Sequence, residues 1–309
     1  MPSTPRAQAF SPGSVGNIGV GFDLFGHTIA AVRDEAIVTR TEQSSVRLLD
    51  IRGSIEGIAT IPRSTETNTA ARAVQALCDS LSLPFGFEIE LIKGIPLNAG
   101  LGGSASSAVA ALVAANALLD TPLSRDALIP LAVEGEFASS QSRQTDNVAP
   151  MLLGGVVFAF EGQVQRFELP ATWHAAVARP HISLRTLDSR QVLREPFGLD
   201  LITPHCANLT RFVLGLERCD ATLIAAGLRD VLVEPRRAAL IPNFHAVQAA
   251  ALEHGALGCS ISGAGPSVFA WFTDADRAHA AASAMAGEFT VPSDTFVTPI
   301  NGIRAERID

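Results

Sequence analysis

The chain has 309 residues and a formal net charge of −8, and 47% of its residues are hydrophobic. Among its 23 basic residues Lys93 is the single lysine, and a glycine follows it, so the chain lacks the Gly-Lys-Ser/Thr triplet of a Walker A loop; it also lacks the Asp-Phe-Gly triplet of protein kinases. Phosphate binding at a surface needs clustered cations, so the acidic balance argues against a nucleic-acid or anionic-membrane surface.

Hydrophobic periodicity in the first half predicts a mixture of strands and helices. Residues 6–40 are predicted to form short strands around a Gly-rich turn, and Phe87–Ile92 alternates apolar residues with Glu as a half-buried strand does. Asn68–Leu81 has helical spacing, and the Ala-rich Ser104–Leu119 predicts a helix that needs close packing partners. The remaining predictions are a helix from the cap Ser124 to about Ser140 and strands at Ile37–Arg40, Val46–Ile51, Gly154–Phe160 and Val164–Leu169.

The second half continues the mixture and includes a segment rich in Arg and Leu at residues 184–202, after its first predicted strand. Strands are predicted at Trp173–Ala178, Ala256–Ser262, Val268–Phe272 and Thr295–Pro299, and helices at Asn208–Leu216, Asp220–Gly227, Phe244–Glu253 and Asp274–Ala286. We therefore expect an α+β protein of two domains, residues 1–162 and 163–309, although no linker marks the boundary.

The four cysteines lie far apart without C-x-x-C spacing. We therefore expect neither a disulfide framework nor a zinc site, and a cytoplasmic location. The N-terminus lacks a basic segment followed by an apolar one, so no signal peptide is expected. No apolar run reaches the roughly 18 residues that a membrane span requires.

Three Gly-rich loops carry polar residues, at 11–23, 94–107 and 262–267. The second leaves a predicted strand and opens a helix, where free backbone N–H groups and the helix dipole form an anion site. A single loop of this kind is more often a tight turn with a serine cap. Three of them together favour a pocket for phosphate and a small molecule.

The three loops resemble the three motifs of the GHMP small-molecule kinases, in the same order and spacing. The second family motif, Pro-x-x-x-Gly-Leu-Gly-Ser-Ser-Ala, corresponds to Pro96 and Gly100–Ala105, with Gly103 in place of the first serine. The segments Asn17–Asp23 and Asp146–Pro150, together with Thr186, Arg190 and Glu234–Arg237, are similar to the members that phosphorylate L-homoserine.

This resemblance implies a fold, a reaction and two cofactors. The N-terminal domain would be like ribosomal protein S5 domain 2, the C-terminal domain ferredoxin-like, and the site would lie between them. ATP with Mg²⁺ would phosphorylate the side-chain hydroxyl of L-homoserine, a step toward threonine. A homodimer is typical of such relatives, and no nucleic acid or membrane partner is expected.

The expected substrate is a zwitterion, so its site needs charges of both signs. Asn17 and Asp23 suit the ammonium group as acceptors, and Arg190 and Arg237 suit the carboxylate because a guanidinium binds it bidentately. Arg236 is interpreted as a solvated neighbour. The resemblance adds Gln144, Asp146, Thr186 and Gly263 to the substrate site.

The nucleotide is expected at the second loop, where backbone amides would hold its phosphates. The resemblance implies that Ser104 and Glu136 hold Mg²⁺, with Glu134 or a solvated glutamate as alternatives to Glu136. Asn68 lies near the nucleotide or only begins a helix, and Lys93 reaches a phosphate or is a solvated cation. The predicted ATP-binding residues are Asn68, Lys93, Pro96, Leu97, Asn98, Ala99, Gly100, Leu101, Gly102, Gly103, Ser104, Ala105 and Ser106.

Asn147 stands where several GHMP relatives carry an aspartate base. An amide does not accept a proton at neutral pH, so we expect catalysis by Asn147, Ser104 and Glu136 without a general base of that kind. The family often has a histidine at the position of Gln144. A glutamine can still form hydrogen bonds, but it cannot carry a proton or a positive charge as histidine does. Two alternatives remain: another GHMP kinase of a mevalonate-like or sugar substrate, and a catalytically silent nucleotide- or metabolite-binding protein on this fold.

Overall fold

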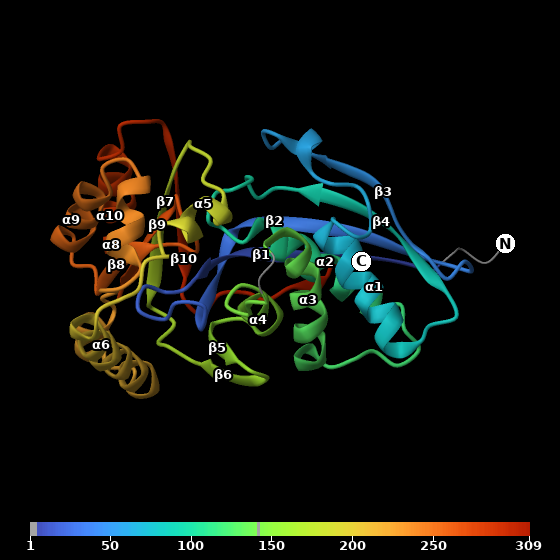
Figure 1. The fold of residues 1–309 in the computed structure, drawn as a ribbon, viewed down its shortest axis with the longest axis horizontal. Helices are drawn as coiled ribbons and strands as arrows, with labels where there is room; N and C mark the ends of the chain where they lie inside the picture. The colour runs from blue at the N-terminus through green and yellow to red at the C-terminus, as the bar shows by residue number, and fades with distance from the viewer. Residues whose placement is uncertain (1–4, 141–142) are drawn as a thin grey trace.

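The computed structural model describes residues 5–140 and 143–309 and contains two sheets (Figure 1). The first is mixed and runs in the order β11-β1-β2-β4-β3, with β5 paired to β2 and β6 to β5. The second is antiparallel and runs in the order β10-β7-β9-β8. The strands are β1 (Arg6–Gly16), β2 (Phe25–Thr41), β3 (Val46–Gly53), β4 (Gly86–Lys93), β5 (Val156–Phe160), β6 (Gln163–Phe167), β7 (His174–Pro180), β8 (Gly258–Ile261), β9 (Val268–Phe272), β10 (Ser293–Pro299) and β11 (Glu306–Arg307).

The helices divide between the two sheets. In Figure 1, α1 to α4 gather beside the first sheet, and α9 and α10 lie at the opposite end, beside the second. This arrangement confirms the α+β class. The helices are α1 (Thr69–Leu81), α2 (Gly103–Asn116), α3 (Arg125–Ser140), α4 (Val148–Leu153), α5 (Thr186–Gln191), α6 (Leu199–Arg218), α7 (Ala221–Gly227), α8 (Glu234–Arg237), α9 (Phe244–Glu253) and α10 (Ala275–Gly287), with 3-10 turns at Ile58–Thr60 and Ala238–Leu240.

Helices α1 and α2 show how composition sets the packing. The predicted apolar face of α1 is buried, including Ala70, Val74 and Leu77. Every residue of α2 from Ala105 to Asn116 is buried, because its small side chains let α1, α3 and the first sheet approach on all sides. The expectation of close packing partners for this helix is confirmed.

Some elements differ from the sequence prediction. Strand β2 is one continuous strand of 17 residues, not several short ones. Helix α6 begins at Leu199 and contains Pro204, whereas the prediction began at Asn208; a proline inside a helix removes one backbone hydrogen bond, which obscures the first turns in the sequence. Helix α4 was not predicted, because its six residues are too few to show a period.

A cluster of buried residues joins the two halves of the molecule. Phe25 of β2 packs edge-to-face against Phe212 of α6 with ring centroids 5.4 Å apart. The Trp271 indole Nε1 of β9 donates to His27 Nε2 of β2 at 3.2 Å, and the other His27 ring nitrogen, Nδ1, lies 3.0 Å from the Thr28 carbonyl. These contacts hold β2 against the second sheet and so fix the walls of the space between the halves.

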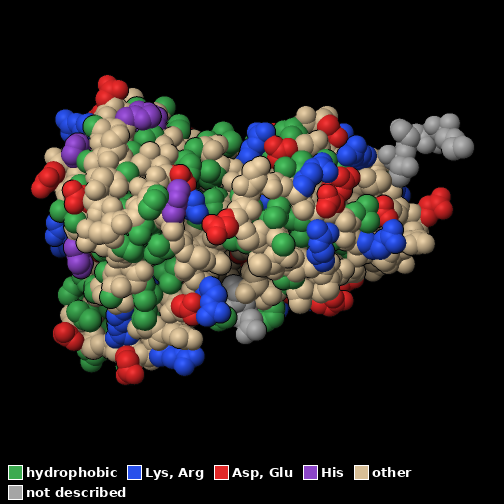
Figure 2. All heavy atoms as spheres, turned by 90° about the horizontal axis from the view of Figure 1, so that it is seen from above, with side chains coloured by type: hydrophobic (Ala, Val, Ile, Leu, Met, Phe, Trp, Pro, Cys, Tyr) green, Lys and Arg blue, Asp and Glu red, His purple; other side chains and the backbone are tan. Residues whose placement is uncertain are grey.

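The face drawn in Figure 2 carries charged side chains of both signs interspersed along both halves. Within residues 5–140 and 143–309, no helix is both long and apolar enough to cross a membrane.

Candidate active site

The second Gly-rich loop joins β4 to α2 and presents unpaired backbone donors. Gly100 and Gly102 have φ angles of 71° and 68°, and a Cβ on Gly100 would lie 2.5 Å from the Ser262 carbonyl, so glycine is required there. The first N–H groups of α2, those of Gly103, Ser104 and Ala105, donate to no oxygen in the described part of the chain. This helix start is therefore suited to an anion.

The third Gly-rich loop supports the second directly. The hydroxyl of Ser262 donates to the Gly100 carbonyl at 2.7 Å, and that of Ser267 donates to the Ala99 carbonyl at 2.6 Å. Asn98 adds a further support from the other side: its Nδ2 donates to Ser183 Oγ at 3.1 Å, and its carbonyl accepts from Leu184 N at 3.2 Å. The second and third loops, more than 160 positions apart, form one unit.

The first Gly-rich loop is tied to the same unit by Asn17. Its backbone N–H donates to Asp146 Oδ2 at 3.1 Å, its Nδ2 donates to the Gly263 carbonyl at 2.7 Å, and its Oδ1 accepts from Asp23 N at 3.0 Å. The Asn17 amide therefore shapes one wall of the cleft, and one Nδ2 hydrogen and the second lone pair of Oδ1 remain for a ligand.

Asp23 and Arg190 form an ion pair in the cleft. Arg190 Nη2 donates to both carboxylate oxygens, at 3.2 and 3.3 Å. Burial raises the pKa of Asp23 above its ordinary value. The positive charges of Arg190 and Arg237 and a hydrogen bond from Gln144 oppose this rise. The Nε of Arg190 is buried and donates to none of the described residues. A carboxylate ligand would satisfy that donor.

Arg237 is 2% exposed, which contradicts a surface location for this cation. Its Nε donates to the Ser189 carbonyl at 3.2 Å and its Nη1 to the Gly263 carbonyl at 3.0 Å. Burial lowers its pKa to about 10, so it stays charged at neutral pH. Its neighbour Arg236 is not simply solvated: it donates to the Pro196 carbonyl at 2.9 Å and stacks on Phe197.

Asn147 belongs to a hydrogen-bonded chain that the sequence did not reveal. Ser14 Oγ donates to Asn147 Oδ1 at 2.7 Å, and Asn147 Nδ2 donates to Asp146 Oδ1 at 3.1 Å. Asp146 is 2% exposed, and burial together with the Asp23 charge raises its pKa to about 7. Ser14 lies in the first Gly-rich loop, but no local pattern marks a serine whose partner lies 133 positions away.

Ser104 and Glu136 offer two oxygens beside the start of α2. Ser104 Oγ donates to Glu136 Oε2 at 3.1 Å, and burial raises the pKa of Glu136 to about 7. A hydroxyl and a carboxylate next to free amides are ligands of the type that Mg²⁺ shares with phosphates. Glu134, the alternative to Glu136, instead pairs with Arg143 at 2.8 Å and does not line the cleft.

One cleft with a volume of 610 Å³ is lined by Asn17, Asp23, Ser104, Glu136, Gln144, Asp146, Asn147, Arg190, Arg237 and Gly263, whereas Ser14, Ser262 and Ser267 do not line it. It includes Thr186 at the start of α5 and Asn68, whose Oδ1 caps α1 by accepting from Ala70 N and Ala71 N. Two predicted ATP-binding residues, Ala105 and Ser106, do not line it; Ser106 is fully buried and its hydroxyl donates to the Ser11 carbonyl. Ser107, Ala264 and Gly265 of the predicted Gly-rich loops also line the cleft. The lining residues missed by the sequence prediction are Thr60, Ile61, Pro62, Thr67, Thr69, Leu91, Ala138, Ser139, Leu184, Arg185 and Leu187.

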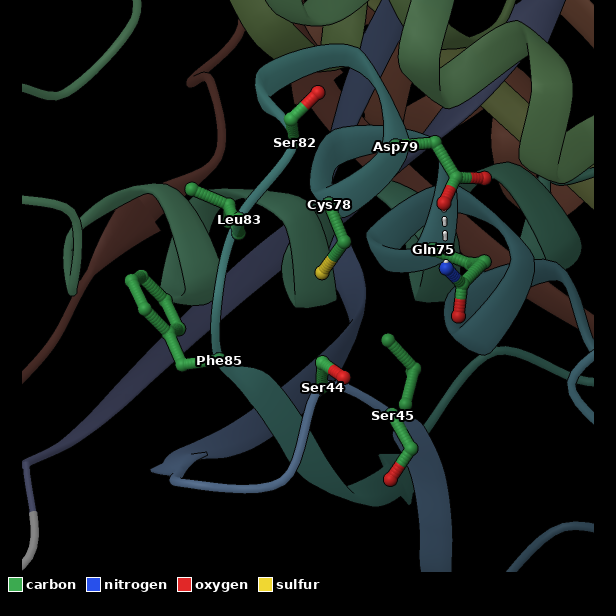
Figure 3. A pocket seen from close by; sticks show the side chains of 9 residues that line it. Ser44, Ser45, Gln75, Cys78, Asp79, Ser82, Leu83 and Phe85 are labelled. Atoms are coloured by element: carbon green, nitrogen blue, oxygen red, sulfur yellow. Dashed lines mark hydrogen bonds between the residues drawn. The ribbon is translucent and has the colours of Figure 1, made fainter.

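A second, smaller hollow of 290 Å³ lies at the other end of α1 (Figure 3). Its charged group is the carboxylate of Asp79, which Gln75 Nε2 approaches to 2.8 Å. Burial raises the pKa of the neighbouring Cys78 thiol to about 11, so that thiol is protonated. The lining of this hollow contains no Lys or Arg.

Comparisons with known proteins place the chain among small-molecule kinases of the GHMP family. The family "GHMP kinases N terminal domain" matches residues 68–155, and "GHMP kinases C terminal" matches residues 214–290. A homoserine kinase of Xylella fastidiosa (strain M12) is 47% identical over 97% of this chain and 93% of its own, and one of Chlorobium phaeobacteroides is 36% identical over 94% and 96%. The crystal structure of homoserine kinase from Cytophaga hutchinsonii matches with a TM-score of 0.93 at 35% identity, covering 100% of this chain and 99% of that one.

Proposed function

The chain belongs to the GHMP kinases, and on that basis we propose that it transfers the γ-phosphate of ATP to the side-chain hydroxyl of L-homoserine. The two-domain GHMP fold expected from the motifs is confirmed by these matches. The free thiols of all four cysteines support a reducing, cytoplasmic setting for this reaction.

One observation carries the choice of substrate: a single cleft holds an anion-binding helix start and both signs of charge. The charges are the Asp23–Arg190 ion pair and the guanidinium of Arg237. A neutral polyol would leave these buried charges without ligand partners, whereas an amino acid supplies one group for each sign.

We infer that the substrate exchanges partners with the Asp23–Arg190 pair. Its carboxylate takes Arg190, whose Nε is unsatisfied, and its ammonium takes Asp23, which then keeps a positive neighbour. A ligand with only one of the two charges would satisfy one residue and strand the other. Zwitterions are therefore favoured over hydroxy acids and amino alcohols.

For phosphoryl transfer the chain positions groups and neutralises charge. The amides of Gly103 to Ala105 would receive phosphate oxygens, and Ser104 with Glu136 would hold Mg²⁺. The metal, when bound, neutralises phosphate charge. Ile61, Pro62 and Leu97 are apolar residues of the cleft lining, and we place the nucleoside beside them.

Asn147 acts by orientation in this proposal. Both ends of its amide are engaged, by Ser14 and Asp146, so its direction toward the cleft is set. An amide takes no proton from the attacking hydroxyl, and the loose transition state of phosphoryl transfer lets that proton leave late, to phosphate or solvent.

The test is substrate-dependent ADP release with ATP and Mg²⁺, run with L-homoserine, mevalonate and galactose in parallel. With L-homoserine we expect ADP and a new phosphomonoester in equal amounts, the phosphomonoester being detected by ³¹P NMR. A rate with L-homoserine no higher than the ATPase background would refute the proposal, and a higher rate with mevalonate or galactose would replace its substrate.

A further inference from the structure

The single lysine of the chain ends β4, where the loop that we assign to phosphate begins. Lys93 is 4% exposed, so the sequence-based alternative of a solvated cation is wrong. An ammonium has three donors, and Lys93 Nζ has three acceptors within the protein: the Asp34 carboxylate, the Gly103 carbonyl at 2.8 Å and Ser107 Oγ at 2.8 Å. No proton of this lysine remains for a nucleotide in this arrangement.

The partner carboxylate, Asp34 on β2, touches both ends of the same loop. Its Oδ1 accepts from the backbone N–H groups of Gly94 and Ile95, each at 3.0 Å, where the loop leaves β4. Its Oδ2 accepts from Lys93 and, at 2.8 Å, from Ser107 in the first turns of α2, where the loop ends. Asp34 itself is fully buried, so these contacts replace all of its water.

We propose that Asp34, Lys93 and Ser107 are positioning residues that clamp the two ends of the phosphate loop together, and that Lys93 does not bind phosphate itself. The Gly103 carbonyl, held by Lys93, belongs to the first residue of α2, so the clamp also fixes the direction of the free N–H groups. This inference rests on the proposed use of that loop for ATP.

The clamp has a physical reason in the composition of the loop. Gly100, Gly102 and Gly103 give the backbone the approach that phosphates need, but glycine also gives it many alternative conformations. Tying both loop ends to one buried carboxylate limits these alternatives before the nucleotide binds. Preorganised donors then need no rearrangement during phosphoryl transfer.

The alternative hypothesis, that Lys93 contacts a phosphate directly, makes a different prediction. To reach the nucleotide, Nζ would have to leave Asp34 and strand a fully buried carboxylate. In that case removing Asp34 would release the lysine for ATP. If the clamp is correct, removing Asp34 damages the loop as much as removing the lysine does.

The experiment compares Lys93→Met, Asp34→Asn and the double variant. We expect each single variant to lower kcat/KM for ATP by about 100-fold, since a loop displaced by an ångström costs that much, while KM for L-homoserine changes little. The double variant, with no stranded charge, should recover about tenfold over either single variant. A double variant no better than Lys93→Met, or an Asp34→Asn variant with normal or improved KM for ATP, would overturn the clamp.

Two further variants keep the proposal testable if the buried changes prevent folding. Ser107→Ala keeps both charges and removes the contacts of the hydroxyl with Lys93 and with Asp34, and it should raise KM for ATP about fivefold without changing KM for L-homoserine. Arg179→Met is the matched control, because it breaks the 2.7 Å ion pair with Asp294 in the second sheet; it should leave both KM values unchanged. A Ser107→Ala variant with the wild-type KM for ATP would count against the clamp.

The inference and the proposed function fail separately. If the wild-type protein releases no ADP with L-homoserine, the proposed function fails. The clamp is then tested by direct calorimetric titration of ATP into the same variants, with the same order of affinities expected.

Discussion

Replacing Asp23 by Asn tests the exchange of partners between the substrate and the Asp23–Arg190 pair. The side chains are 29% and 30% exposed, so the pair is partly shielded from water. Losing one partner of a well-buried charge pair costs about 2–5 kcal/mol, and partial exposure places this site at the lower end, about 2 kcal/mol. Because 1.36 kcal/mol is tenfold, we expect kcat/KM for L-homoserine to fall about 30-fold.

The same substitution should favour a substrate that lacks the ammonium group. 4-Hydroxybutanoate carries the carboxylate and the hydroxyl, and in the wild-type protein it must take Arg190 from Asp23. The amide that Asp23→Asn introduces is neutral and releases Arg190, so kcat/KM for 4-hydroxybutanoate should rise about fivefold, an effect of about 1 kcal/mol.

The assay is steady-state ADP release with both substrates, with Asp188→Asn as the control. Asp188 is a carboxylate on the same short helix as Arg190 but pairs with Arg185 at 2.8 Å, so its loss should leave both rates near wild type. If Asp23→Asn lowered the rates with both substrates equally, the exchange would be refuted. The ion pair would then be a structural feature of the cleft.

Three further predictions concern the metal, the orienting amide and the stability of the fold. Since the pKa of Glu136 is about 7, protons compete with Mg²⁺ for its carboxylate, so the Mg²⁺ concentration that gives half the maximal rate should rise as pH falls from 8 to 6. The Glu136→Gln variant should need about tenfold more Mg²⁺ and lose this pH dependence. An unchanged pH dependence in the variant would contradict the role of Glu136 as a metal ligand. Asn147→Asp should give no gain in kcat, because the new carboxylate lies beside Asp146 and competes for one proton; a large gain with unchanged KM would show that a base was missing. Burial lowers the pKa of His27 from 6.5 to about 4, so between these pH values the unfolded chain binds one more proton than the folded chain. The free energy of unfolding should therefore fall by about 3 kcal/mol as pH drops from 6.5 toward 4. Urea unfolding at several pH values should show this loss in the wild-type protein but not in His27→Gln, and equal pH dependences would refute the prediction.

Much of the fold and of the Gly-rich part of the cleft could be predicted from the sequence, because the signals are local. The apolar residues of α1 recur at helical spacing, and α2 is rich in alanine, a strong helix former. Each signal lies within one short segment and indicates a helix without knowledge of the rest of the fold. Glycine at 100 and 102 permits a positive φ without the clash of a side chain, and both residues adopt it. Local reasoning fell short where an element is short or irregular, as in α4 and the start of α6.

Side-chain partners were decided only by the tertiary structure. Asp23 meets Arg190 across 167 positions, and Ser14 meets Asn147 across 133. Lys93 shows the limit most clearly: the sequence offered phosphate or solvent as its surroundings, and the structure supplies Asp34. The antiparallel register of β2 and β4 sets Glu35 opposite Ile92, so Asp34, which precedes Glu35, comes beside Lys93, which follows Ile92. A period along one strand tells which face a residue occupies, but the residue beside it depends on how two distant strands are paired.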